Sequence, residues 1–228
     1  MKKIIAVTAM VMVASAGLWA QEPTVGLTVD ATYASKYIFR GVVLGEHAFH
    51  PSFELSYSDF YAGIWGNVAL SKKDQYPDNE EWDFYFGKSF ALTDIASLDV
   101  GYTYYYYPEF SSNNGTQEVY IGMNWDVSGF SPGVYAYYDF DLEAFTVQGS
   151  VGTSFPLESM GTSLDLSATV GHVDGDGFSY TYWSVGAAVP FKLSEKSTLT
   201  AGVTFATHDI SGLKDNNIAG TLSYTFAF

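Results

Sequence analysis

Apolar and polar residues alternate one by one along almost the whole chain after residue 24. The last segment shows the pattern best: Ile218, Leu222 and Phe226 fall on one face of an extended chain, and Thr221 and Thr225 fall on the other. Alternation with a period of two is typical of β-strands that have one apolar and one polar face. A helical period is nearly absent. The pattern therefore predicts an all-β protein.

About twelve segments share this alternation, and most have about the 9–13 residues that a tilted strand needs to cross the hydrocarbon layer of a membrane. An even number of such strands predicts a transmembrane antiparallel up-and-down β-barrel with both termini on the periplasmic side. We expect strands near residues 24–40, 48–58, 59–70, 81–91, 97–108, 116–126, 132–140, 143–155, 163–173, 179–191, 197–207 and 217–228.

The predicted connections alternate in character. One set is mostly polar, rich in Gly, Asn or Asp and often long, and comprises residues 41–47, 71–80, 109–115, 141–142, 174–177 and 208–216. The other set comprises residues 58–59, 92–96, 127–131, 156–162 and 192–196. Bacterial barrels have longer outer loops and shorter periplasmic turns. We therefore expect the first set to lie on the outer side of the membrane.

Residues 1–20 have a basic start, an apolar run from Ile4 to Val13 and small residues up to Ala20. This order is typical of a secretory signal peptide. We expect cleavage after Ala20, with cleavage after Ala16 as the alternative. Residues 21–228 then form a single transmembrane β-barrel domain.

Composition narrows the class of protein further. The chain has 10 Lys and Arg and 25 Asp and Glu, so loss of the two lysines of the signal peptide leaves a net charge of 8 − 25 = −17. Such an acidic surface excludes nucleic acid as a partner, because phosphates need Lys and Arg. The absence of cysteine excludes disulfides and thiolate metal sites. Aromatic residues make up 18% of the chain, which fits a barrel in the outer membrane of a Gram-negative-type bacterium.

The chain ends on an aromatic residue in the sequence Ser-Tyr-Thr-Phe-Ala-Phe. Tyr224, Phe226 and Phe228 fall on the same face of this segment. A terminal aromatic on the last strand resembles the C-terminal signal of outer-membrane barrels. We therefore expect the barrel-assembly machinery, reached through the Phe228 strand, and outer-membrane lipids as partners.

The segment Ser35-Lys36-Tyr37-Ile38-Phe39-Arg40-Gly41 is similar to the S-x-Y-x-F-R-G stretch in the first strand of the TorF-type porin family. Further similarity lies in residues 60–67, 81–85 and 99–108. The resemblance is clearest in the first half of the mature chain. It implies an outer-membrane location and a channel role, and it adds little about the permeant solute.

Charged residues recur on the polar face, which would line the lumen of a barrel. Counting from Val25, the odd positions of the first strand face lipid and the even positions face the lumen, so Arg40, the only arginine of the chain, points inward. Facing charges of opposite sign create a transverse field that can select small polar solutes. The predicted pore-lining residues are Asp30, Lys36, Arg40, Glu54, Asp83, Asp99, Tyr105 and Glu118.

A second interpretation of the basic residues is structural. Lys36 and Arg40 could pair with Glu54 or Asp83 to hold the wall together, because side chains fill most of the interior of a narrow barrel. A β-bulge between residues 34 and 38 would also reverse which side chains of the first strand face inward.

The remaining motifs suggest little chemistry. The four tyrosines of residues 104–107 are typical of an aromatic girdle at a membrane interface; the alternative is that Tyr105 and Tyr107 stack against a sugar or nucleoside in the pore. The four histidines show no recurring ligand spacing, and no nucleotide, phosphate or redox motif is present. The sequence predicts neither a cofactor nor a metal.

Three functions are compatible with these observations. The first is a narrow channel for passive diffusion of small polar solutes, favouring cations because its lumen is acidic. The second is an outer-membrane lipid-processing enzyme of the phospholipase or lipid A deacylase type, with His172 as general base and Ser179 as nucleophile. The third is a structural or adhesive barrel without a conducting pore. We predict the first, and we predict that the protein is not an enzyme.

Overall fold

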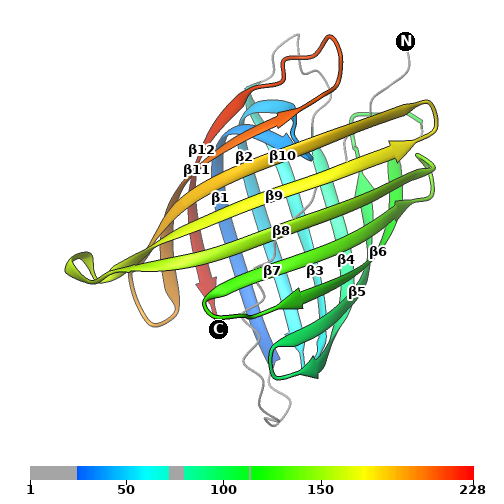
Figure 1. Cartoon of the computed structure of the whole chain (residues 1–228). Coiled ribbons are helices and arrows are strands. Elements are labelled where there is room, and N and C mark those ends of the chain that lie inside the picture. Colours follow the sequence, from blue (N-terminus) through cyan, green and yellow to red (C-terminus); the bar gives the residue numbers. More distant parts are fainter. Residues whose placement is uncertain (1–24, 72–79, 113) are drawn as a thin grey trace.

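The computed structural model describes residues 25–71, 80–112 and 114–228, so the predicted signal peptide lies outside the described residues. Twelve antiparallel strands close into a barrel in which each strand pairs with its neighbours in sequence and β12 pairs back onto β1 (Figure 1). The strands are β1 (Val25–Phe39), β2 (Val42–Tyr57), β3 (Phe60–Ser71), β4 (Glu81–Thr93), β5 (Ala96–Tyr106), β6 (Gly115–Trp125), β7 (Phe130–Asp139), β8 (Ala144–Leu157), β9 (Thr162–Gly175), β10 (Phe178–Lys192), β11 (Ser197–His208) and β12 (Asn217–Ala227). A short 3₁₀ turn, η1 (Glu158–Met160), follows β8. The predicted fold class and strand number are confirmed.

No helix within these described ranges is both long and apolar enough to cross a membrane.

Alternation along each strand separates an apolar outer surface from a polar interior. On β1 the exposed Val25, Val29 and Tyr33 point outward, so the even positions between them point inward. The outer surface carries a broad belt of exposed apolar side chains that includes Phe53, Phe84, Ile121, Val147, Val170, Val185, Val203 and Leu222.

The two sides of the barrel interior differ in the size of their side chains. Inward positions of β8–β12 are mostly small and carry hydroxyl groups, for example Ser150, Ser167, Thr169, Ser184, Thr204, Thr221 and Ser223. Inward positions of β3–β7 carry tyrosines instead, namely Tyr61, Tyr85, Tyr105, Tyr120, Tyr135 and Tyr137. The lumen is therefore lined by an aromatic wall facing a wall of small hydroxyl residues.

The first connection differs from its prediction. We expected a loop over residues 41–47, but β2 begins at Val42, and only Arg40 and Gly41 connect it to β1. The apolar residues at 42–44 explain the difference, because Val42 and Val43 pair with the end of β1 and extend the hairpin.

The end of β1 also differs from its prediction. The side chain of Ser35 accepts the backbone N–H of Gly220 at 2.8 Å, and the register with β2 shifts after Tyr37. Tyr37, directly before the shift, and Phe39, after it, are each only 3% exposed. The prediction that odd positions of the first strand face lipid is wrong for these two residues, because a local irregularity changes which side chains point inward.

Candidate functional site in the barrel interior

The turn between β1 and β2 folds into one end of the barrel, which we call the Arg40 end. Arg40 and Gly41 have φ of 42° and 83°, as a two-residue hairpin turn of the I′ type requires. A Cβ atom at Gly41 would lie 2.6 Å from Thr207 O on β11 and 2.6 Å from Tyr182 Cβ on β10. Only glycine fits this approach, so the turn packs closely against β10 and β11.

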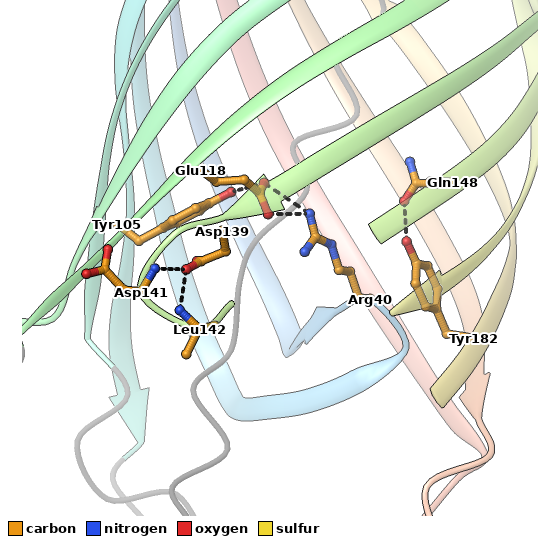
Figure 2. A network of polar contacts seen from close by, with 8 residues as sticks. All are labelled: Arg40, Tyr105, Glu118, Asp139, Asp141, Leu142, Gln148 and Tyr182. Carbon is orange, nitrogen blue, oxygen red and sulfur yellow. Dashed lines mark hydrogen bonds and ion pairs between the residues drawn. The ribbon is translucent and has the colours of Figure 1, made fainter. Parts of the chain in front are cut away.

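The side chain of Arg40 crosses the interior to β6. Its Nη2 atom donates to Glu118 Oε1 at 3.0 Å and to Oε2 at 2.9 Å, and the two side chains are 3% and 2% exposed (Figure 2). Tyr105 Oη donates to Glu118 Oε1 at 2.9 Å. The guanidinium carbon lies 4.8 Å from the ring centroids of both Phe39 and Tyr137. The arginine is therefore held by an anion and by two aromatic faces.

Further buried side chains fill the Arg40 end around this ion pair. Tyr37 Oη donates to Glu81 Oε2 at 2.7 Å, and Tyr182 Oη donates to Gln148 Oε1 at 2.6 Å. Asp139 Oδ1 accepts the backbone N–H groups that follow it in the β7–β8 turn (Figure 2). The aromatic part of this packing consists of Tyr37, Phe39, Trp65, Tyr85, Tyr105 and Tyr107.

The packing at the Arg40 end is polar as well as tight. Several buried polar atoms there have no hydrogen-bond partner in the protein. Buried polar groups are normally hydrogen-bonded to protein or to ordered water. The Arg40 end is therefore chemically suited to contain water. Among these atoms are Arg40 Nε and Thr146 Oγ1.

Away from the Arg40 end the interior carboxylates are only partly buried. Asp30 accepts hydrogen bonds from Thr32 and Thr225, each at 2.5 Å. Glu54, on the neighbouring strand β2, and Asp99, on β5, accept hydrogen bonds from tyrosine hydroxyls. The interior thus changes from closely packed at the Arg40 end to partly exposed and acidic further along the barrel.

The contacts of the predicted pore-lining residues differ from those that the sequence suggested. Arg40, Tyr105 and Glu118 come together, whereas Lys36 donates to Asn217 Oδ1 at 3.0 Å. The suggested pairing of the two basic residues with Glu54 or Asp83 is wrong. The residues lie on strands far apart in sequence, so the alternation could not show which of them would meet.

The run of four tyrosines alternates between the two faces, as expected. Tyr105 is 2% exposed and Tyr107 is 5% exposed. Both are buried in the Arg40 end, so neither offers a free ring face to a sugar or nucleoside. Tyr37 and Phe39 are not among the predicted pore-lining residues. The irregularity that turns them inward lies within residues 34–38, where a β-bulge was the alternative interpretation.

On the outer surface the structure brings His172 and Ser179 together. Ser179 Oγ lies 3.3 Å from His172 Nε2, and His172 Nδ1 lies 3.0 Å from Thr181 Oγ1. All three residues lie at the β9–β10 hairpin. The group at Nδ1 is a hydroxyl rather than a carboxylate, and the nearby Asp209 accepts the backbone N–H of Thr181. Within the described ranges no group of three or more His, Asp or Glu side chains could hold a metal ion.

The closed barrel, its apolar outer belt and its polar interior define a transmembrane β-barrel of the porin type. The chain belongs to the Gcw_chp family, described as a bacterial protein of unknown function, whose family model matches residues 20–226. This match does not confirm the TorF-type name that the first-strand motif suggested. No curated protein matches the sequence.

Solved outer-membrane channels share the fold at low sequence identity. The KdgM porin is 10% identical with a TM-score of 0.61, over 88% of this chain and 99% of that one. The NanC porin is 15% identical with a TM-score of 0.55, over 89% and 98%. The COG4313 outer membrane channel from Pseudomonas putida F1 is 8% identical with a TM-score of 0.58, over 96% and 100%. At these identities the similarity establishes the fold alone.

Proposed function

We propose that this protein is a narrow outer-membrane channel through which small polar solutes diffuse passively, with a preference for cations. The observation that carries the proposal is the barrel's division into an apolar outside and an acidic, hydroxyl-rich inside. Twelve strands enclose a much narrower lumen than the 16–18 strands of general porins. The fold shared with solved porins supports the same conclusion.

The Arg40 end is the constriction of this channel. The inward-folded turn and the Arg40–Glu118 pair leave little free space there, and their polar atoms give water and small ions a path of hydrogen-bonding groups. Fixed charges at a constriction act on a permeant ion with little screening. Larger solutes are excluded by size.

The cation preference follows from the charges inside the barrel. Lys36 and Arg40 are the basic residues among the inward positions identified above, and Arg40 is neutralised by Glu118. The partly exposed carboxylates of Asp30, Glu54 and Asp99 therefore dominate the field in the open part of the lumen. Such a field raises the local cation concentration.

The test is a planar-bilayer measurement on the refolded mature protein in a KCl gradient. We expect a small conductance and a reversal potential of the sign that reports K⁺ permeating faster than Cl⁻. A barrel that passes neither salt current nor small polar solutes in a liposome-swelling assay would refute the channel. A conducting barrel with anion selectivity would refute only the cation preference.

The charge of the lumen also separates this chain from one of its structural neighbours. The KdgM porin has been solved in complex with disordered oligogalacturonate, an anionic sugar chain. Carboxylates along the lumen of the present barrel would repel such a solute. We expect no block of the K⁺ current by oligogalacturonate.

We further propose that the Arg40 end faces outward and that the termini lie on the periplasmic side. The longer connections among the described strands, residues 107–114 and 209–216, are at the Arg40 end, as in bacterial barrels. Phe228 is largely exposed at the opposite end and packs against Phe226 at 4.5 Å between ring centroids. It is thus accessible to the barrel-assembly machinery.

The contact between Ser179 and His172 favours lipid hydrolysis as a second candidate function. The pair lies on the outer surface, where Ser179 could attack a lipid ester with His172 as base. Release of fatty acid from phospholipid vesicles by the refolded protein, abolished in His172→Ala and unchanged in His208→Ala, would support it. Equal release by the parent protein and His172→Ala would eliminate it.

A further inference from the structure

The tyrosines of β3–β7 lie flat against the inner wall, and glycines make this arrangement possible. Tyr61, Gly87, Gly101 and Tyr120 are direct neighbours across β3, β4, β5 and β6. A Cβ atom at Gly87 would lie 2.2 Å from Tyr61 Oη, and one at Gly101 would lie 2.3 Å from Tyr120 Oη. The two rings therefore extend over the two glycines, and their hydroxyl oxygens meet at 2.6 Å.

The same construction occurs twice more on this wall. Tyr85 lies over Gly63, where a Cβ atom would be 2.3 Å from its hydroxyl, and Tyr135 lies over Gly122, where a Cβ atom would be 2.3 Å from its ring. Tyr85 Oη donates to Glu54 Oε2 at 3.1 Å. We call Tyr61, Tyr85, Tyr120 and Tyr135 the tyrosine wall.

Two hydroxyl groups of the tyrosine wall converge on Asp99. Tyr61 Oη donates to Asp99 Oδ1 at 2.8 Å, and Tyr135 Oη donates to Oδ2 at 3.1 Å. No salt bridge between described residues involves Asp99 or Glu54. Both carboxylates therefore have hydrogen-bond partners within the wall, while their charge has no basic partner.

The rings of Tyr61, Tyr120 and Tyr135 are half-buried. One face of the Tyr61 ring and one face of the Tyr120 ring lie over glycines, so the exposed part of these two rings belongs to the face that is turned to the lumen. The wall across the lumen carries small side chains such as Ser167 and Thr204. The side chains across the lumen from the rings are therefore short.

We propose that the tyrosine wall, together with Asp99 and Glu54, is a binding site for organic cations of the quaternary ammonium class. Such a cation has no hydrogen to donate and needs only aromatic faces and negative charge. The tyrosine hydroxyl groups donate hydrogen bonds to carboxylates, which increases the electron density of the rings and strengthens this attraction. A sugar would instead have to compete with the tyrosines for the same carboxylate oxygens.

The inference rests on the proposed channel function only in that solutes must enter the lumen. Its test therefore measures binding without transport. Choline would be titrated into the refolded, detergent-solubilised protein and followed by saturation-transfer NMR. The matched probe is 3,3-dimethyl-1-butanol, which has the same shape as choline but carries no charge. We expect choline to bind about tenfold more tightly than this alcohol, corresponding to the combined cation–π and charge attraction.

Variants separate the site from general effects of charge. Asp99→Asn should weaken choline binding about tenfold, and Tyr61→Leu, which removes one ring, about fivefold. The matched control is Asp165→Asn, because Asp165 is an inward carboxylate on the hydroxyl wall, held by Ser154 and Ser163. It should change choline binding less than about twofold, which is the size of an unspecific effect. Heat-modifiable mobility in gel electrophoresis would show that each variant folds.

The outcomes distinguish this inference from the channel. Equal binding of choline and its neutral analogue, tighter binding of glucose, or the same loss in Asp165→Asn as in Asp99→Asn would each overturn the site. A protein that conducts K⁺ but does not bind choline retains the channel and loses the site. A protein that binds choline but passes no current retains the site and loses the channel.

Discussion

The ion pair between Arg40 and Glu118 allows a quantitative test of how the packing at the Arg40 end is held together. Removing one partner of a buried pair leaves an uncompensated charge and costs about 3–5 kcal/mol. Glu118 would keep its hydrogen bond from Tyr105, and Arg40 would keep its two ring contacts. We therefore expect Arg40→Met and Glu118→Leu each to lower the free energy of unfolding by about 3 kcal/mol, the lower part of that range.

The double variant Arg40→Met/Glu118→Leu carries the sharper expectation. It removes both charges at once and replaces them with apolar side chains, which is often neutral in stability for a buried pair. We expect a free energy of unfolding within about 1 kcal/mol of that of the parent protein, so the coupling energy should be about 5 kcal/mol.

The assay is equilibrium unfolding in urea in lipid vesicles, followed by tryptophan fluorescence and by heat-modifiable mobility. Conductance of the same samples shows whether the constriction has changed. The reasoning fails if the free energy of unfolding of each single variant lies within about 1 kcal/mol of that of the parent protein, because removing one partner of a buried pair destabilises a protein by more than this. It also fails if the destabilisation of the double variant equals the sum of the destabilisations of the two single variants.

Three further predictions concern other parts of the barrel. Gly41→Ala should lower the free energy of unfolding by about 1–2 kcal/mol, because alanine is strained at a positive φ. It should also raise the conductance, because the added Cβ atom pushes the turn away from Thr207. The control Gly129→Ala, at φ of 82° with nothing within 4 Å, should show only the loss of stability. Asp99→Asn should shift the reversal potential toward zero without changing heat-modifiable mobility, and an unchanged potential would exclude this carboxylate from the permeation path. Deletion of Phe228 should lower the yield of assembled barrel in cells while leaving refolding in detergent intact; normal assembly in cells would argue against recognition of this residue.

The alternation predicted nearly all of the fold because it is a local property. Every expected strand is present, and most boundaries agree within a few residues. The exception at the start of β2 has a clear cause. His47, Gly45 and Gly41 suggested a loop, but the apolar Val42 and Val43 pair with the end of β1. Strand pairing thus extends over a short segment in which the turn-forming residues predicted a loop.

The site was predictable in its composition but not in its contacts. Alternation predicts an inward Glu118, which is 1% exposed, whereas Arg40 lies in the turn after the change of phase, so its burial does not follow from alternation. Their meeting depends on the β1–β2 turn folding across the lumen, which in turn depends on Gly41 tolerating a close approach to β10 and β11. The change of phase near Ser35 brings Tyr37 into the same packing. Such an irregularity follows from tertiary contacts, and nothing in the local pattern of β1 marks it.

The pairing of tyrosine with glycine explains how a narrow barrel keeps open space beside bulky residues. A tyrosine pointing straight into the lumen would fill it, but a glycine on the adjoining strand lets the ring lie along the wall. Gly101 serves Tyr120 in this way, and Gly122 serves Tyr135. At the Arg40 end Tyr105 instead pairs with Thr116 and is fully buried. The glycines beside Tyr120 and Tyr135 therefore allow these two rings to line the lumen without filling it.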